Sequence, residues 1–166
     1  MKDGKSIAIV PGSFDPITYG HISLVKYAAE RYDTVYLAVM INDQKQYLFS
    51  LEEREYIAKL ALEDIKNAVV VSSRGMLWKL AEDIGADAIV KGYRNQTDYD
   101  YELKMAEFNL AHNPNAPTVL IKAEESLEAL SSTQVRGKLR DGEAISEDLP
   151  PKAECAIRSI LKERKK

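Results

Sequence analysis

The feature that most constrains the fold is a regular alternation of short apolar runs with segments of helical periodicity. The apolar runs have the length of buried strands and lie at residues 6–10, 34–41, 68–72, 88–90 and 118–121. Helical patterns follow at residues 20–32, 51–64, 76–84, 98–112 and 131–139, and a last one opens at Pro150-Pro151. Because no hairpin signal joins the strands, we expect a doubly wound α/β fold, with five parallel strands and helices on both faces.

Several helix boundaries are marked by specific residues. Ser50 and Glu53 form a capping-box pattern, which predicts a helix that begins at residue 51 and runs to about residue 64. Gly85 follows the 76–84 pattern, as glycines at helix C-termini commonly do. Pro151 is expected near the first position of the last helix. Residues 76–78 (Met-Leu-Trp) are expected to pack in the core or against a helix.

Length, charge and cysteine content narrow the class of protein. A chain of 166 residues suggests one domain over residues 1–166, and a net charge of −3 gives no case for nucleic-acid binding. Neither a signal peptide nor a run of membrane-spanning length is present. The single cysteine, Cys155, cannot form an intramolecular disulfide. We therefore expect a cytoplasmic protein with neither a nucleic-acid nor a membrane partner.

The segment from Pro11 to His21 (PGSFDPITYGH) joins the first predicted strand to the first predicted helix. That turn lies at the carboxyl end of a strand, where α/β sheets bind nucleotides. The helix N-terminus offers free N–H groups and a partial positive charge, both suited to phosphate. His21, directly after Gly20, could donate a hydrogen bond to a phosphate oxygen; the alternative is a histidine that only caps the helix. Ser13 is either a turn residue or a ligand contact.

Further polar residues follow other predicted strands. Lys45 lies in a polar loop after the second strand, and Lys91 and Arg94 flank Gly92 after the fourth. Two cations there could hold a polyphosphate, with glycine permitting close backbone approach. Taken alone, a loop lysine is usually solvated.

A second group of candidates lies at two helix starts. Glu102 follows an acidic first turn, in which Asp98 and Asp100 favour the helix dipole. The run 131–133 (Ser-Ser-Thr) opens a helix, where hydroxyls either cap the helix or bind phosphate, and Arg136 could assist. The candidates that follow predicted strands, Ser13, His21, Lys45, Lys91, Arg94 and Ser132, share one edge of the predicted sheet. The chain has no Ser-His-Asp order, P-loop or GxGxxG motif.

Together these motifs resemble the phosphopantetheine adenylyltransferases of the nucleotidyltransferase superfamily. The matching pieces are PGSFDPITYGH, the Lys45 loop with FSLEER at 49–54, KGYR at 91–94, DYDYE at 98–102 and SSTQVR at 131–136. The resemblance covers nearly the whole chain. Thr18 stands at the first position of the superfamily's HxGH signature.

The resemblance implies a Rossmann-like fold, a homohexamer, and transfer of AMP from ATP to 4′-phosphopantetheine with release of pyrophosphate. It implies that His21 stabilises the transition state and that Mg²⁺ takes part, held mainly by ATP phosphates and water. The residues that would contact ATP are Ser13, Phe14, His21, Gly92, Tyr93, Arg94, Glu102, Leu127, Glu128, Ala129, Leu130, Ser131, Ser132 and Thr133. Those that would hold phosphopantetheine are Ser13, Lys45, Leu77 and Lys91.

The chain departs from the family pattern around the acceptor phosphate. Lys91 stands where the family usually has arginine, and the usual Lys-Lys-Pro of the lysine loop is Lys45-Gln46-Tyr47 here. Lysine offers a point charge in place of a bidentate fork. Two alternatives stay open: a nucleotidyltransferase with another phosphorylated acceptor, and a nucleotide-binding module without turnover.

Overall fold

The computed structural model describes residues 4–165. Its centre is a sheet of five parallel strands in the order β3-β2-β1-β4-β5. The strands are β1 (Ile7–Gly12), β2 (Thr34–Met40), β3 (Ala68–Ser73), β4 (Ala88–Tyr93) and β5 (Thr118–Lys122). The chain adds β2 and β3 on one side of β1 and then crosses to place β4 on the other side. The predicted doubly wound Rossmann-like sheet is confirmed, and its strand order reverses between β1 and β4.

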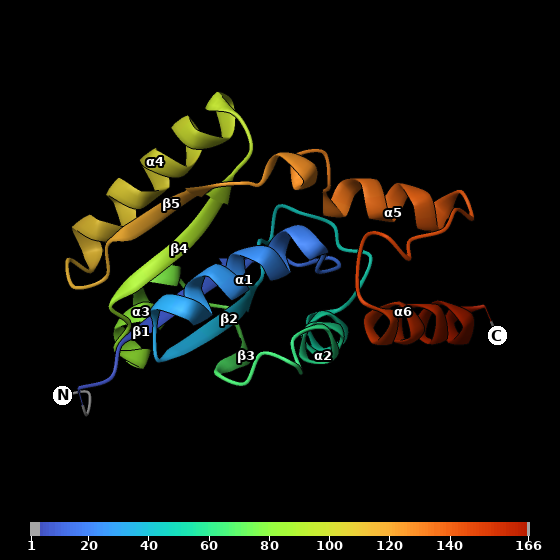
Figure 1. Cartoon of the computed structure of the whole chain (residues 1–166), viewed down its shortest axis with the longest axis horizontal. Helices are drawn as coiled ribbons and strands as arrows, with labels where there is room; N and C mark the ends of the chain where they lie inside the picture. The colour runs from blue at the N-terminus through green and yellow to red at the C-terminus, as the bar shows by residue number, and fades with distance from the viewer. Residues whose placement is uncertain (1–3, 166) are drawn as a thin grey trace.

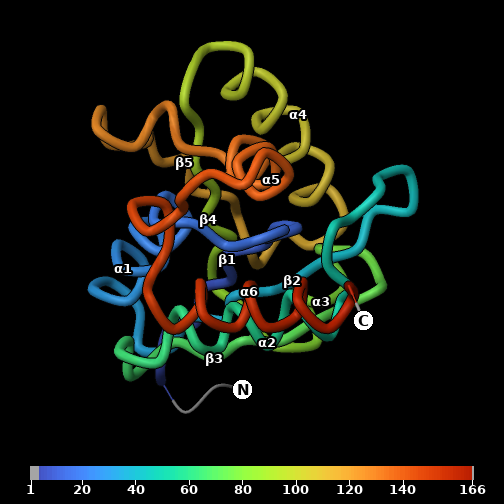
Figure 2. Tube along the Cα trace, turned by 90° about the vertical axis from the view of Figure 1, so that its right-hand side faces the viewer, coloured from blue at the N-terminus to red at the C-terminus, as the bar shows by residue number. Residues whose placement is uncertain are grey.

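Helices cover both faces of the sheet, as expected from the alternating pattern (Figure 1). They are α1 (Tyr19–Arg31), α2 (Leu51–Ala61), α3 (Leu77–Ile84), α4 (Gln96–His112), α5 (Ser132–Arg140) and α6 (Pro151–Arg164), with a short 3-10 helix, η1 (Glu125–Leu127). Helices α2 and α6 lie side by side (Figure 2). No helix among residues 4–165 is long and apolar enough to cross a membrane.

Alternate residues of β1 supply two separate cores. Ala8 and Val10 belong to a large cluster that also contains residues of α1, α2 and α6. Ile9 points the other way, into a smaller cluster with Ala81 of α3 and Ile89 of β4. A central parallel strand buried on both faces explains why residues 7–10 are continuously apolar.

The structure corrects several predicted boundaries. Strand β4 continues to Tyr93, because Gly92 pairs with Ile121 and Tyr93 pairs with Lys122 of β5. The polar Lys91 therefore belongs to the strand and does not follow it. Helix α2 ends at Ala61 and not near residue 64, because the chain turns at once toward β3, with Ile65 N donating to Leu62 O at 2.9 Å.

The predicted helix ends are otherwise well supported. Pro151 opens α6 at its first turn, and Gly85 ends α3 with a left-handed φ of 76°. Leu77 packs against the smaller core and Trp78 is half-buried, as expected for packing residues. Met76 is an exception: it is exposed, because it precedes the first turn of α3 and lies outside the face that packs on the sheet.

The Ser50 cap gives a prediction about stability. Ser50 Oγ accepts a hydrogen bond from Glu53 N at 3.1 Å, and Glu53 Oε1 accepts one from Ser50 N at 2.9 Å. Ser50→Ala should lower the free energy of unfolding by about 1 kcal/mol, because a helix N–H loses its partner. Urea unfolding measures this loss. An unchanged unfolding midpoint with reduced activity would contradict a purely structural role for Ser50.

Candidate active site

A cavity of about 840 Å³ opens at the carboxyl ends of β1 and β4, where the strand order reverses. This is the place at which α/β sheets bind ligands, and the volume suits a nucleotide-sized molecule. Twelve of the predicted site residues line it: Phe14, His21, Lys45, Lys91, Gly92, Tyr93, Arg94, Glu102, Leu127, Leu130, Ser131 and Ser132. Residues from five separate stretches of the chain thus meet at one edge of the sheet.

The other predicted residues lie beside the cavity or away from it. Ser13 is not among the lining residues, although Gly12 and Phe14 on either side of it are. Glu128, Ala129 and Thr133 belong to the segment 127–133, whose other residues line the cavity, but they do not line it themselves. Leu77 packs against the smaller hydrophobic core.

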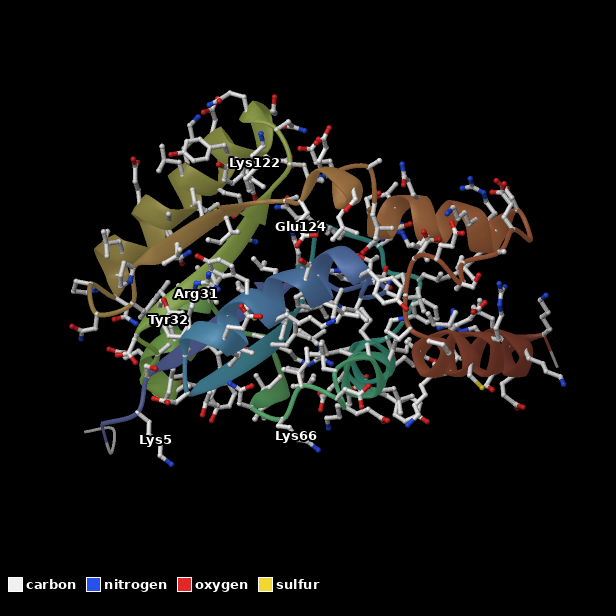
Figure 3. All side chains as sticks on the ribbon, in the orientation of Figure 1. Lys5, Arg31, Tyr32, Lys66, Lys122 and Glu124 are labelled. Atoms are coloured by element: carbon white, nitrogen blue, oxygen red, sulfur yellow. The ribbon has the colours of Figure 1, made fainter. Side chains whose placement is uncertain are left out.

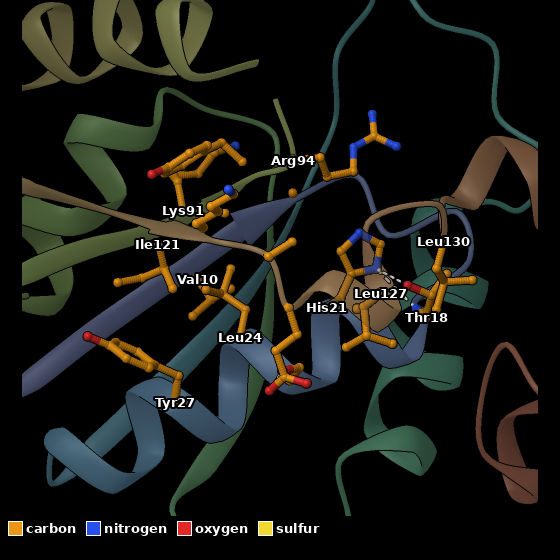
Figure 4. A pocket seen from close by; sticks show the side chains of 18 of the residues that line it. Val10, Thr18, His21, Leu24, Tyr27, Lys91, Arg94, Ile121, Leu127 and Leu130 are labelled. Carbon is orange, nitrogen blue, oxygen red and sulfur yellow. Dashed lines mark hydrogen bonds between the residues drawn. The ribbon is translucent and has the colours of Figure 1, made fainter. Parts of the chain in front are cut away.

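Apolar lining residues escaped the sequence analysis. Val10, Leu24, Tyr27 and Ile121 contribute to the cavity wall from β1, α1 and β5 (Figure 4). Their positions in a strand or an amphipathic helix carry the same pattern as ordinary core residues, so periodicity alone could not separate them. Lys122 ends β5 and Glu124 follows it, where the chain leaves the carboxyl edge of the sheet above α1 (Figure 3).

The turn between β1 and α1 has an unusual backbone. Phe14 adopts a φ of 50°, a conformation that few non-glycine residues take. Its ring folds back over Gly12, where a Cβ atom would lie only 2.9 Å from Phe14 Cζ. The same ring meets His21 edge-on, with centroids 4.9 Å apart. Glycine at position 12 therefore allows Phe14 to support the His21 ring.

Two other segments of the chain hold this turn. The Asp15 carboxylate, which is almost fully buried, accepts hydrogen bonds from Leu48 N and Phe49 N. Ser132 Oγ donates to Pro16 O at 2.7 Å, and Arg136 Nη1 donates to Asp15 O at 2.9 Å. Ser132 and Arg136, which the sequence suggested for phosphate, thus tie α5 to the turn.

His21 serves as a helix cap and still leaves one ring nitrogen for a ligand. Thr18 N donates to His21 Nδ1 at 3.0 Å, so Nδ1 accepts and carries no proton. The neutral ring then carries its proton on Nε2. Nε2 lies on the side of the ring away from Thr18, toward Lys91 and Arg94 (Figure 4). The capping alternative and the functional one are therefore compatible.

The surroundings of His21 keep it neutral. Burial, assisted by the positive charges of Lys91 and Arg94, lowers the pKa of His21 from 6.5 to about 4. At neutral pH the ring is an uncharged N–H donor in a positively charged cavity. Such a donor can bind an anion without itself carrying a charge.

We predict that the His21 ring titrates with a midpoint near pH 4 in the free protein. Histidine NMR resonances recorded against pH measure it, and His112→Gln assigns the two signals. Lys91→Ala should move the midpoint upward, because a neighbouring positive charge is removed. A midpoint near 6.5 would contradict the neutral ring.

The same shift links stability to pH. The folded-state pKa of about 4 lies below the ordinary value of 6.5, so between these values the unfolded chain binds a proton at position 21 that the folded chain does not. The free energy of unfolding should therefore fall as the pH is lowered from 6.5 to 4. His21→Gln should lack this part of the pH dependence.

The cations at the carboxyl end of β4, Lys91 within the strand and Arg94 just after it, are paired with carboxylates of α4. Lys91 Nζ lies 3.4 Å from Glu102 Oε1, and Arg94 Nε lies 3.2 Å from Asp98 Oδ2. Lys91 and Tyr93 face α4, whereas Gly92 faces α1, where a Cβ would come 3.6 Å from Leu24 Cδ2. Gly92 keeps a strand conformation, and its contribution is open space between β4 and α1.

The fold and the site together define an α/β protein of the nucleotide-binding type, with a neutral histidine and several cations at the carboxyl edge of its sheet. The cytidylyltransferase-like family model matches residues 9–138. The chain is 40% identical over 158 residues to a phosphopantetheine adenylyltransferase of Lactobacillus acidophilus, covering 95% of this chain and 98% of that one. The chain belongs to the cytidylyltransferase-like family and, within it, to the phosphopantetheine adenylyltransferases.

A second curated relative agrees with this family, and a solved structure agrees with the fold. A phosphopantetheine adenylyltransferase of Caldanaerobacter subterraneus subsp. tengcongensis is 39% identical over 144 residues, covering 87% of this chain and 90% of the relative. A crystal structure assigned to a nicotinate-nucleotide adenylyltransferase of Vibrio parahaemolyticus superposes with a TM-score of 0.69 at 19% identity, covering 93% of each chain. This structural similarity supports the assignment of the fold.

Proposed function

We propose that this protein transfers AMP from ATP to 4′-phosphopantetheine, forming dephospho-coenzyme A and releasing pyrophosphate. The observation that carries the proposal is a neutral His21, with its free N–H on the cavity side beside Lys91 and Arg94. The names of the relatives supply the two substrates.

The chemistry requires no nucleophile from the protein. An oxygen of the acceptor phosphate attacks the α-phosphorus of ATP, a new P–O bond forms, and the bond to pyrophosphate breaks. Because the acceptor is already an anion, catalysis consists of positioning and of stabilising the developing charge. His21 Nε2–H donates to an oxygen of the α-phosphate, where that charge increases.

The two substrates are held by different groups of residues. We assign ATP to Phe14, His21, Gly92–Arg94, Glu102 and the 127–133 segment, and the acceptor to Lys45 and Lys91, with Ser13 between them and Leu77 on the acceptor side. The proximity of Lys45 Nζ to Ser13 Oγ, 3.5 Å, supports a shared phosphate position. Lys91 must exchange part of its contact with Glu102 for the substrate phosphate.

We propose that Mg²⁺ accompanies ATP and is held mainly by phosphate oxygens and water. Within residues 4–165, no group of three or more His, Cys, Asp or Glu side chains could hold a metal ion, which favours this arrangement over a protein-bound ion. When bound, the ion neutralises charge on the departing pyrophosphate.

We also propose a cytoplasmic homohexamer. Helix α4 buries only Asn109 and exposes large apolar side chains at Tyr101, Leu103, Met105, Phe108 and Leu110. An apolar surface of this kind supports self-association. Analytical ultracentrifugation measures the number of subunits.

The cytoplasmic location rests on a different observation. The exposed, unpaired Cys155 is compatible with a reducing compartment.

The direct test is a pyrophosphate-release assay over a matrix of nucleotides and phosphorylated acceptors, with mass spectrometry of the product. We expect turnover with ATP and 4′-phosphopantetheine. Turnover with a different acceptor, such as a polyol phosphate with CTP, would replace the substrate assignment. ATP binding without any product would identify a nucleotide-binding module in place of an enzyme.

A further inference from the structure

Arg54 forms a buried support beneath the phosphate-binding turn. Its side chain is 1% exposed, and Nε donates to Phe49 O at 3.2 Å. Nη1 donates to Ser13 O at 2.8 Å and to Met40 O at 3.0 Å. One guanidinium thus joins the turn after β1, the end of β2 and the start of α2.

Tyr47 lies on this support. Its ring centroid is 3.9 Å from the guanidinium carbon of Arg54, a distance typical of a cation–π contact. The ring is therefore held over Arg54, whose guanidinium also binds the Ser13 turn. Tyr47 itself does not line the cavity, although Lys45 in the same loop does.

The direction of the hydrogen bonds at the Tyr47 hydroxyl follows from its partners. Asn42 N lies 2.7 Å from Tyr47 Oη, and a backbone N–H can only donate. The phenol oxygen therefore accepts from Asn42. Its own proton remains available for Ser13 Oγ, which lies 3.4 Å away.

Ser13 receives a second donor from Lys45. Lys45 Nζ lies 3.5 Å from Ser13 Oγ, and an ammonium group can only donate. A hydroxyl has one proton and two lone pairs. When Ser13 Oγ accepts hydrogen bonds from both Tyr47 and Lys45, its own proton must point toward a third group. Because Gly12 and Phe14 line the cavity on either side of Ser13, an anion bound there is the natural acceptor.

We infer that Tyr47 is a positioning residue for the acceptor phosphate: held over Arg54, its hydroxyl donates to Ser13 Oγ and turns the Ser13 proton toward the phosphate that Lys45 attracts. The inference rests on the proposed function, since it concerns the phosphorylated substrate of that site. It also gives a role to a residue at which the lysine loop departs from the family pattern. A neutral hydrogen-bond relay accompanies Lys45 where the family usually has a second lysine and a proline.

The test combines Tyr47→Phe, Ser13→Ala and the double variant, with Tyr56→Phe as control. Phenylalanine keeps the ring over Arg54 and removes only the hydroxyl. Tyr56 is a tyrosine of α2 with 54% exposure, so its variant controls for the loss of a phenol group. Steady-state kinetics vary each substrate in turn, and calorimetry measures 4′-phosphopantetheine binding without ATP.

Tyr47→Phe should raise both the KM and the Kd for 4′-phosphopantetheine about three- to tenfold, as expected for one neutral hydrogen bond. The KM for ATP should change less than about twofold, and the melting temperature should stay within about 2 °C of the wild type. In the Ser13→Ala background the Tyr47→Phe effect should disappear, because Tyr47 acts through Ser13. Tyr56→Phe should match the wild type.

The outcomes separate this inference from the proposed function. An active wild type with an unchanged Tyr47→Phe variant would overturn the inference alone. The inference would also be overturned if Tyr47→Phe changed the KM for 4′-phosphopantetheine by the same factor in the Ser13→Ala background. An equal change in the KM values of both substrates would overturn it as well. A wild type that neither binds 4′-phosphopantetheine nor turns it over would overturn the inference and the proposed function together.

Discussion

His21→Ala is expected to lower kcat by about 100- to 1000-fold, the usual effect of removing one preorganised donor to a developing oxyanion. The structure identifies that donor as Nε2–H, because Nδ1 accepts from Thr18 N. ATP binding should change little, since the contribution of His21 increases as charge develops at the α-phosphate. Pyrophosphate release at saturating substrate concentrations measures kcat, and calorimetry measures the Kd for ATP.

Two variants sharpen this experiment. His21→Gln keeps a side-chain amide that can donate, so it should retain more activity than His21→Ala. His112→Ala removes the other histidine, which lies exposed at the end of α4, and should keep wild-type kinetics. The alanine variant also loses the Nδ1 contact with the helix start, so its fold is checked by circular dichroism. A folded His21→Ala protein with wild-type kcat would remove His21 from the mechanism.

Lys91→Ala is expected to raise the KM for 4′-phosphopantetheine about 10- to 100-fold, which corresponds to the 1.5–3 kcal/mol of a charge-assisted hydrogen bond. The KM for ATP should rise much less. Lys91→Arg should retain activity, because arginine keeps the charge and offers a planar fork. Steady-state kinetics with each substrate varied in turn measure these effects.

The Lys91–Glu102 ion pair makes a second variant necessary. The Glu102 side chain is only 14% exposed, so Lys91→Ala would leave its carboxylate unpaired near the substrate phosphates. The double variant Lys91→Ala/Glu102→Gln removes that repulsion and reports the loss of the cation alone. Its KM for 4′-phosphopantetheine should lie between those of the wild type and the single variant. An increase confined to the KM for ATP would assign Lys91 to the nucleotide.

The β1–α1 junction is an example of a feature that the local sequence pattern predicts correctly. A buried strand, a Gly-Ser turn and a helix start were all readable before His21, and the structure has them in that order. Ser50 and Glu53 form the predicted capping box, and Pro151 opens α6. These features depend on residues within about one helical turn of each other, so the sequence carries their full signal.

The predicted ends of strands and helices were wrong where contacts with a neighbouring element set them. Lys91, Gly92 and Tyr93 are not an apolar run, yet β5 extends β4 through all three by pairing with them. Leu62 and Ile65 continue the apolar pattern of α2, but the turn toward β3 ends the helix before them. Strand pairing and chain reversal depend on contacts with other segments of the chain, and hydrophobic periodicity within one segment carries no information about those contacts.

The sequence by itself determined the order of strands and helices and most of the polar residues that meet at the carboxyl edge of the sheet. Only the tertiary structure decided the chemical state of those residues. Ser13 and Arg54 are 41 positions apart, and Lys91 meets Glu102 only because α4 packs beside β4. The low pKa of His21 likewise requires burial together with Lys91 and Arg94. Periodicity reports the backbone of one segment, whereas charge, tautomer and hydrogen-bond direction depend on which distant segments pack against it.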